Sequence, residues 1–164
     1  MYEVGFIVDS MSGKVAKWLR IVGCDVLYAD PSQDDSTLLG RLGERVLVTR
    51  DKELVDRAKR TGKHVVLVPE DVEEALAMIS LYYNIQLRIR PGLTRCPFCN
   101  EKLEVRKRDS VLGMPREVVY SHSRFLICPS CGKVFWFGTH YWEMLRTLSR
   151  VKKKKWKISN SWGR

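Results

Sequence analysis

Four of the five cysteines in the 164-residue chain stand in two C-P-x-C pairs, Cys96/Cys99 and Cys128/Cys131. Two such turns can supply four thiolates at the corners of a tetrahedron, the arrangement in which proteins hold structural zinc. A closed four-sulfur site leaves no open position on the ion, so we expect one structural Zn²⁺ without a catalytic role. The alternative for these four cysteines is a pair of redox dithiols. The fifth cysteine, Cys24, is expected to be an inert buried thiol.

A second set of candidates consists of carboxylates that follow apolar runs. Asp9 and Asp51 each come directly after such a run, and Asp34 and Asp35 lie in the loop after another. Ligand sites in open α/β sheets gather outside the carboxyl ends of the strands, and clustered carboxylates need a cation to stay ionised together. The pattern predicts an Mg²⁺ or Mn²⁺ site that can activate water for phosphodiester cleavage. The alternative for any single aspartate is a structural role at a strand end or as a helix cap.

Neighbours of Asp51 extend this hypothesis. Thr49 can hydrogen-bond a metal-bound water or a phosphate, or it can simply be a β-branched strand residue. Glu53 is the nearest further acid. The chain contains no GxGxxG, GxxxxGK[ST] or GxSxG motif, which argues against dinucleotide-binding, P-loop and serine-hydrolase functions.

Short apolar runs alternate with helical patterns in the first half, which predicts a mostly parallel α/β sheet flanked by helices. Strands are expected over 4–8, 25–28, 45–49 and 64–68, and helices over 13–22, 35–42, 52–60 and 70–83. Ser12 is a candidate cap for the first helix. Lys14, Lys17 and Arg20 lie off its apolar stripe and are expected to point outward.

The second half differs in kind. Apolar and aromatic runs at 103–105, 125–127 and 134–137 surround the cysteine pairs and predict a small β-rich zinc ribbon, with a terminal helix over about 140–150. We therefore divide the chain into an α/β domain at 1–90, a zinc-ribbon domain at 91–150, and a basic Lys/Trp tail at 151–164.

The charge is as uneven as the pattern. The chain carries a net charge of +10, which divides into −1 for residues 1–93 and +11 for residues 94–164. A strongly basic module favours a polyanion partner, most often nucleic acid, although a lysine run is also typical of a solvated tail. The candidate residues for binding nucleic acid are Lys14, Lys17, Arg20, Arg50, Arg106, Lys107, Arg108, His140, Lys152, Lys153, Lys154, Lys155 and Trp156.

Membrane and secretory signals are weak. No apolar run approaches the roughly 18–20 residues of a membrane span, and the first residues lack the basic start of a signal peptide. We expect a cytoplasmic protein without a membrane partner.

Together these segments resemble the Mut-seven C-terminal RNase domain family, over about residues 4–148. The matching segments are FIVD at 6–9, M-x-GKVAKWLR at 11–20, the acidic pair at 34–35 before two leucines, VLVTRD at 46–51, the two C-P-x-C pairs, and WFGTHYWEM at 136–144. The resemblance implies a PIN-like fold and a ribonuclease with Mg²⁺ or Mn²⁺ at Asp9, Asp35 (or Asp34) and Asp51.

Two other functions remain open at this stage. A non-catalytic RNA-binding adaptor in ribosome or tRNA maturation would share the basic surface and need no metal at the acidic residues. A toxin-like nuclease with a protein antitoxin fits less well, because the zinc ribbon occupies much of the chain.

Overall fold

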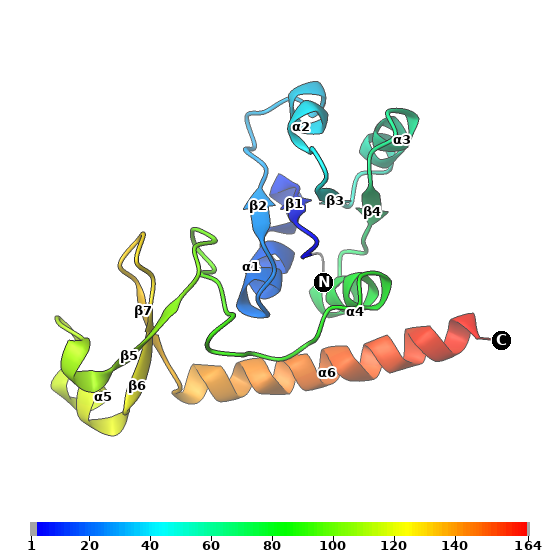
Figure 1. The fold of residues 1–164 in the computed structure, drawn as a ribbon. Helices are drawn as coiled ribbons and strands as arrows, with labels where there is room; N and C mark the ends of the chain where they lie inside the picture. The colour runs from blue at the N-terminus through cyan, green and yellow to red at the C-terminus, as the bar shows by residue number, and fades with distance from the viewer. Residues whose placement is uncertain (1–2, 164) are drawn as a thin grey trace.

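The first half of the chain forms a four-stranded parallel sheet in the order β2-β1-β3-β4 (Figure 1). The computed structural model describes residues 3–163. The strands fall within the predicted ranges and are β1 (Phe6–Val8), β2 (Val26–Tyr28), β3 (Val46–Thr49) and β4 (Val65–Leu67). In the central register, Val8 pairs with Tyr28 on one side and with Val48 on the other. The α/β prediction is therefore confirmed.

Helices cover both faces of this sheet because successive strand residues point to opposite sides. Phe6 and Val8 belong to a core shared with α1 (Gly13–Ile21) and α4 (Val72–Tyr82). Ile7 belongs to a second core on the other face, shared with α2 (Asp35–Arg41) and α3 (Lys52–Arg60). A single 3-10 turn, η1 (Ser10–Ser12), separates β1 from α1.

The helix starts differ in one respect from the sequence prediction. Ser12 stands at the N-cap position of α1, but its side chain makes no capping hydrogen bond. The first helical turn follows η1 directly, and the backbone N–H of Ser12 already donates to the Asp9 carbonyl. The expectation that Ser12 caps the helix is wrong.

The second sheet is antiparallel, in the order β5-β6-β7. Its strands are β5 (Glu104–Lys107), β6 (Arg124–Ile127) and β7 (Val134–Trp136). The basic run at 106–108 therefore lies partly within β5. Between β5 and β6 the chain adds a 3-10 turn, η2 (Arg108–Ser110), and a short helix, α5 (Arg116–Ser121), which begins directly after Pro115. The sequence patterns predicted neither of these.

The terminal helix α6 spans Thr139–Trp162 and is much longer than the predicted 140–150. Its second half is held against the α/β domain, since Val151 is fully buried and Ile158 packs on the same core. Lys155 donates from Nζ to the Ser80 carbonyl at 3.1 Å. The predicted tail is thus a helix that packs along α4 (Figure 1).

Among residues 3–163, no helix is both long enough and apolar enough to cross a membrane.

Candidate metal centres and the groove between them

The four predicted zinc ligands come together at one end of the small sheet. Their sulfur atoms all lie within 4.8 Å of one another, with 3.7 Å from Cys96 to Cys131 and 3.4 Å from Cys99 to Cys128. Tetrahedral zinc with bonds of about 2.3 Å would hold sulfur atoms about 3.8 Å apart. The donor set and its spacing therefore fit a structural zinc ion.

The two cysteine turns have the same backbone form. Each ends in a residue with a left-handed conformation, Asn100 with φ 71° and Gly132 with φ 75°. These turns let the chain reverse immediately after the second cysteine of each pair. Burial raises the pKa of Cys96 to about 12, so its thiolate form requires a cation beside it.

Arg20 anchors the first cysteine turn to the α/β domain. Its side chain is buried, with Nε and Nη2 donating to the Val26 carbonyl at 3.0 and 2.8 Å and Nη1 donating to the Pro97 carbonyl at 3.0 Å. The prediction that Arg20 points outward is therefore wrong, because the ribbon covers the side of α1 that an isolated domain would expose. All three of these contacts go to protein carbonyls, which gives Arg20 a structural role.

Asn100 makes a second connection, which the sequence reasoning missed. Its Oδ1 accepts from the Val26 N–H at 2.9 Å and its Nδ2 donates to Asp25 at 2.7 Å. Asp25 also pairs with Arg45 at 2.7 Å, and the hydrogen bond from Arg45 is the main cause that lowers the pKa of the Asp25 carboxyl. The available signal was that Asn stands where the other cysteine turn has Gly132.

Asp9 occupies the position where the strand order of the parallel sheet reverses. It directly follows β1, and the chain continues to β2 on one side of β1 and later to β3 on the other. The carboxylate is 7% exposed, and its Oδ2 accepts hydrogen bonds from the Thr49 hydroxyl and the Arg50 N–H. Its Oδ1 is buried and has no hydrogen-bond partner within residues 3–163. Such an atom is costly unless a ligand satisfies it.

Thr49 joins Asp9 to Asp51. The Thr49 hydroxyl donates to Asp9 and accepts from the Asp51 N–H at 3.0 Å. Asp51 in turn caps α3, because its Oδ1 accepts from the N–H groups of Glu53 and Leu54 at 2.8 and 3.2 Å. Glu53 is exposed on the first turn of α3. Thr49 is therefore a bridge between two predicted site residues.

The other two predicted acids are engaged elsewhere. Asp34 caps α2 through the N–H and hydroxyl of Thr37, and the hydrogen bond from that N–H is the main cause that lowers the pKa of Asp34. Asp35 pairs with Arg57 at 2.7 Å. Across residues 3–163, the four cysteines are the only group of three or more potential metal ligands gathered within 4.8 Å. The carboxylates are thus not drawn together in this way.

A groove of about 660 Å³ lies at the carboxyl ends of the parallel strands, between α1 and the first cysteine turn. Four of the predicted RNA-binding residues, Lys14, Lys17, Arg20 and Arg50, line it. Both lysines are exposed, and the Arg50 guanidinium lies 3.6 Å from the carboxylate of Glu70, which also lines the groove. The charged lining of the groove is therefore mainly cationic, and one of these cations, Arg50, donates its backbone N–H to Asp9.

Within residues 3–163, the remaining predicted RNA-binding residues differ in their exposure and in whether they have an acidic neighbour. Lys107, Lys152 and Lys153 are exposed, Arg108 is half-buried, and Trp156 is 66% exposed. Others have acidic neighbours, as Arg106 has Glu104, His140 has Glu143 and Lys154 has Asp71.

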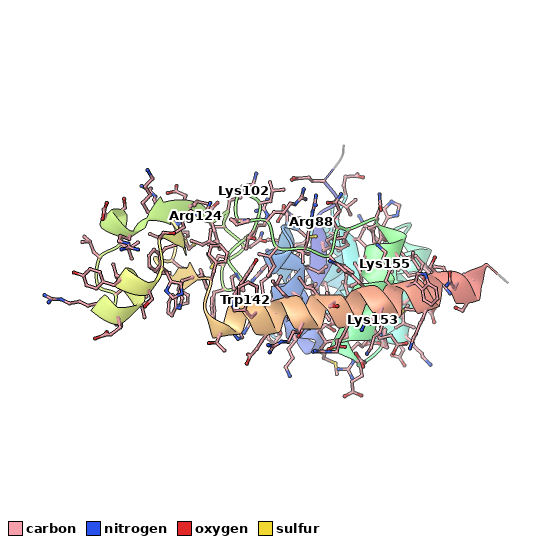
Figure 2. The ribbon with its side chains drawn as sticks, turned by 90° about the horizontal axis from the view of Figure 1, so that it is seen from below. Arg88, Lys102, Arg124, Trp142, Lys153 and Lys155 are labelled. Atoms are coloured by element: carbon pink, nitrogen blue, oxygen red, sulfur yellow. The ribbon has the colours of Figure 1, made fainter. Side chains whose placement is uncertain are left out.

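One face of the molecule carries basic side chains along its length. Figure 2 shows Arg88, Lys102 and Arg124 along one edge of this face, with Lys153 and Lys155 on α6. Of these, Lys155 is partly buried against α4, whereas Lys153 is exposed. These cations come from the segment after α4, the ribbon and the terminal helix, so both halves of the chain contribute basic side chains to this face.

Comparison with known proteins gives one match. The family model described as the Mut7-C RNAse domain matches residues 4–148, a span that includes the acidic residues, the groove and all four clustered cysteines. No curated protein and no solved structure matches the chain.

Proposed function

The chain belongs to the Mut7-C RNAse domain family, and from this premise we propose that it is a metal-dependent ribonuclease. In this proposal the acidic edge of the parallel sheet carries the cleavage site for RNA phosphodiester bonds. The four cysteines hold a structural zinc ion, and the basic surfaces of the ribbon and α6 bind the RNA backbone.

One observation carries the proposal. The Oδ1 atom of Asp9 is buried without a partner where the strand order reverses, the usual position of ligand sites in open α/β sheets. A divalent cation is a ligand that satisfies a buried carboxylate oxygen without needing a proton. Asp51 adds a second donor nearby, since both of its capping bonds use Oδ1 and leave Oδ2 for another partner.

Asp9, Asp51 and Asp35 would hold the Mg²⁺ or Mn²⁺ ion. When bound, such an ion activates water and stabilises negative charge on phosphate oxygens. Asp35 can join the site only after it gives up Arg57, whose ion pair is about 40% exposed on both sides and is therefore weak. Thr49 holds the Asp9 carboxylate in place through its hydroxyl, and Arg50, whose backbone N–H donates to Asp9, lines the groove.

The test is a cleavage assay on fluorescently labelled unstructured and structured RNAs, with and without Mn²⁺. Wild type should cleave in a Mn²⁺-dependent manner, and Asp9→Asn should lose the activity. Asp56→Asn is the matched control, because Asp56 is an exposed acid on α3 outside the proposed site. Full Mn²⁺-dependent activity in Asp9→Asn would overturn the proposal.

A second candidate is an RNA-binding adaptor without a catalytic metal. It is favoured by the capping and ion-pair roles of Asp34, Asp51 and Asp35, which account for these carboxylates without a cation. Calorimetric titration with Mn²⁺ separates the two functions. A saturable site that is lost in Asp51→Asn supports the nuclease, whereas no saturable site supports the adaptor. Asn is itself a good N-cap, so α3 should persist in this variant.

A further inference from the structure

We infer that the first cysteine turn forms one wall of the substrate groove and that Phe98, at its tip, stacks against an unpaired base of single-stranded RNA. The inference deepens the proposed function, because it takes RNA as the substrate and assigns where the strand lies.

The groove is built by both halves of the chain. One wall comes from the start of α1, with Ser12, Lys14 and Lys17, and the other from Pro97 and Phe98 of the cysteine turn. Ser12 is 5% exposed, and its hydroxyl has no hydrogen-bond partner within the described part of the chain. It lies at the N-terminus of a nine-residue helix, where N–H groups and the helix dipole favour an anion. The orphaned hydroxyl and the helix end are both suited to a phosphate in this groove.

Phe98 is an aromatic ring that the cores leave free. It is 55% exposed and lies nearly parallel to Phe135, with ring centroids 6.4 Å apart and planes at 18°. Two ammonium groups approach its ring, Lys17 at 5.3 Å and Lys133 at 4.8 Å from the centroid. These lysines come from α1 and from the second cysteine turn. An exposed ring between two cations combines the two elements by which proteins bind single strands.

This combination favours a single strand over a duplex. A base can stack on Phe98 only if its face is open, and in A-form RNA the base faces are occupied by neighbouring pairs. Lys17 and Lys133 are both exposed, so either ammonium can leave the ring to a base and remain beside the adjoining phosphate. Stacking of this kind has little sequence preference, because every base has a π-face.

The position of Phe98 depends on the zinc site and on two contacts to the α/β domain. It stands between two of the cysteines, while Arg20 holds the Pro97 carbonyl and Asn100 binds β2. A ring fixed in this way loses little freedom when a base stacks on it, which favours binding. Zinc would therefore act on RNA binding through the shape of the groove.

The experiment measures binding of a fluorescein-labelled oligouridylate of about eight nucleotides, within the usual length of a single-strand site, by fluorescence anisotropy. It uses the full zinc-loaded chain without added Mg²⁺ or Mn²⁺, so that no cleavage is required. Phe98→Ala should bind about tenfold more weakly (about 1.4 kcal/mol), and Phe98→Trp should bind like wild type. Tyr120→Ala is the control, since Tyr120 is an exposed ring on α5 outside the groove. Unchanged binding by Phe98→Ala, or an equal loss in Tyr120→Ala, would overturn the inference.

Inorganic polyphosphate, which has no bases, separates stacking from charge. Phe98→Ala should bind it like wild type, whereas Lys17→Ala should weaken binding of both probes. A matched loss of polyphosphate binding in Phe98→Ala would mean that the ring only positions the lysines, and the stacking role would then be wrong. A blunt-ended RNA duplex should likewise be insensitive to Phe98→Ala, and a tenfold loss with it would contradict the single-strand assignment.

Zinc content, measured by mass spectrometry, should be the same in Phe98→Ala and wild type. Retention of RNA binding in Asp9→Asn would show that the groove works whether or not the chain cleaves RNA. The inference and the proposed ribonuclease activity would therefore be contradicted by different results.

Discussion

The cysteine cluster differs from the acidic edge of the parallel sheet in what its side chains contact. The acidic edge consists of Asp9, Asp34, Asp35 and Asp51. All four thiols lie within 4.8 Å of one another, and two backbone turns place them there. The carboxylates have local partners instead, such as the α2 cap for Asp34, the α3 cap for Asp51 and Arg57 for Asp35. Among the carboxylates of residues 3–163, only Asp9 keeps a buried oxygen without a partner.

This difference follows from the chemistry of the two donor groups. A thiol is a weak hydrogen-bonding group, so a cluster of thiols has little to gain from nearby N–H groups and is stabilised mainly by a metal. A carboxylate accepts strongly from helix N-termini and from Arg. An ion at the acidic edge must therefore compete with protein partners, whereas zinc at the cysteines completes the local fold.

The strongest test of this contrast removes one thiol. Cys128→Ser should abolish zinc binding and unfold the ribbon, because zinc binding in small metal domains contributes on the order of 10 kcal/mol to folding. Limited proteolysis should then cut within 95–138, and metal analysis should find no zinc. Cys24→Ala is the control, since Cys24 is outside the cluster and should leave zinc content unchanged. A protease-resistant, zinc-loaded Cys128→Ser would contradict the prediction.

Asp9→Asn tests whether the acidic edge serves cleavage rather than folding, in contrast to the cysteine cluster. We expect a loss of Mn²⁺-dependent cleavage of about 100-fold or more, since a metal ion contributes several kcal/mol to the transition state. Stability should stay within about 1 kcal/mol of wild type or rise, because the change removes a buried charge that has an unpaired oxygen. Urea unfolding and the cleavage assay measure the two effects, and a large loss of stability would count against the site as described.

Asn100→Gly probes the connection between the two regions. Glycine keeps the left-handed backbone but removes the bonds to Val26 and Asp25. The free energy of unfolding should fall by about 1–3 kcal/mol, because the Val26 N–H loses its acceptor. Asn100→Ala should be destabilised further by its positive φ. Chemical unfolding at saturating zinc measures both, and equal stability of Asn100→Gly and wild type would show that the side chain does not hold the interface.

The smallest expected effect concerns the competition between Arg57 and a metal ion for the Asp35 carboxylate. Arg57→Ala should tighten Mn²⁺ binding by up to about fivefold, since an exposed ion pair is worth about 0.2–1 kcal/mol. Arg60→Ala, which changes another exposed arginine of α3, controls for the general loss of positive charge. Calorimetric titration compares the two variants, and an equal effect of both would assign the change to net charge.

Several features were readable from the sequence because they are local. Apolar runs at the strand period and stripes at the helix period located the four parallel strands and the helices α1 to α4 to within a few residues. The C-P-x-C pairs identified the thiol cluster, since such turns bring two sulfurs together whatever surrounds them. The positions of Asp9 and Asp51 after β1 and β3 also followed from this pattern.

Other predictions were wrong or incomplete where a distant part of the chain decided the outcome. Residues 151–164 were separated as a basic tail, but Val151 and Ile158 meet the α/β core and keep α6 helical to Trp162. Arg20 was expected outside, but the cysteine turn covers it. The periodicity of a single helix does not show which of its residues another domain will cover.

The sequence by itself determined the α/β pattern, the cysteine cluster and the uneven charge, because each depends on residue type and short-range spacing. Tertiary structure alone decided that Asp35 pairs with Arg57 and that, within residues 3–163, Oδ1 of Asp9 is left without a partner. It also decided that the ribbon closes one side of the groove and presents Phe98 there. These outcomes depend on contacts between residues up to about eighty positions apart, such as Arg20 with Pro97, and such contacts exist only once the two halves have packed together.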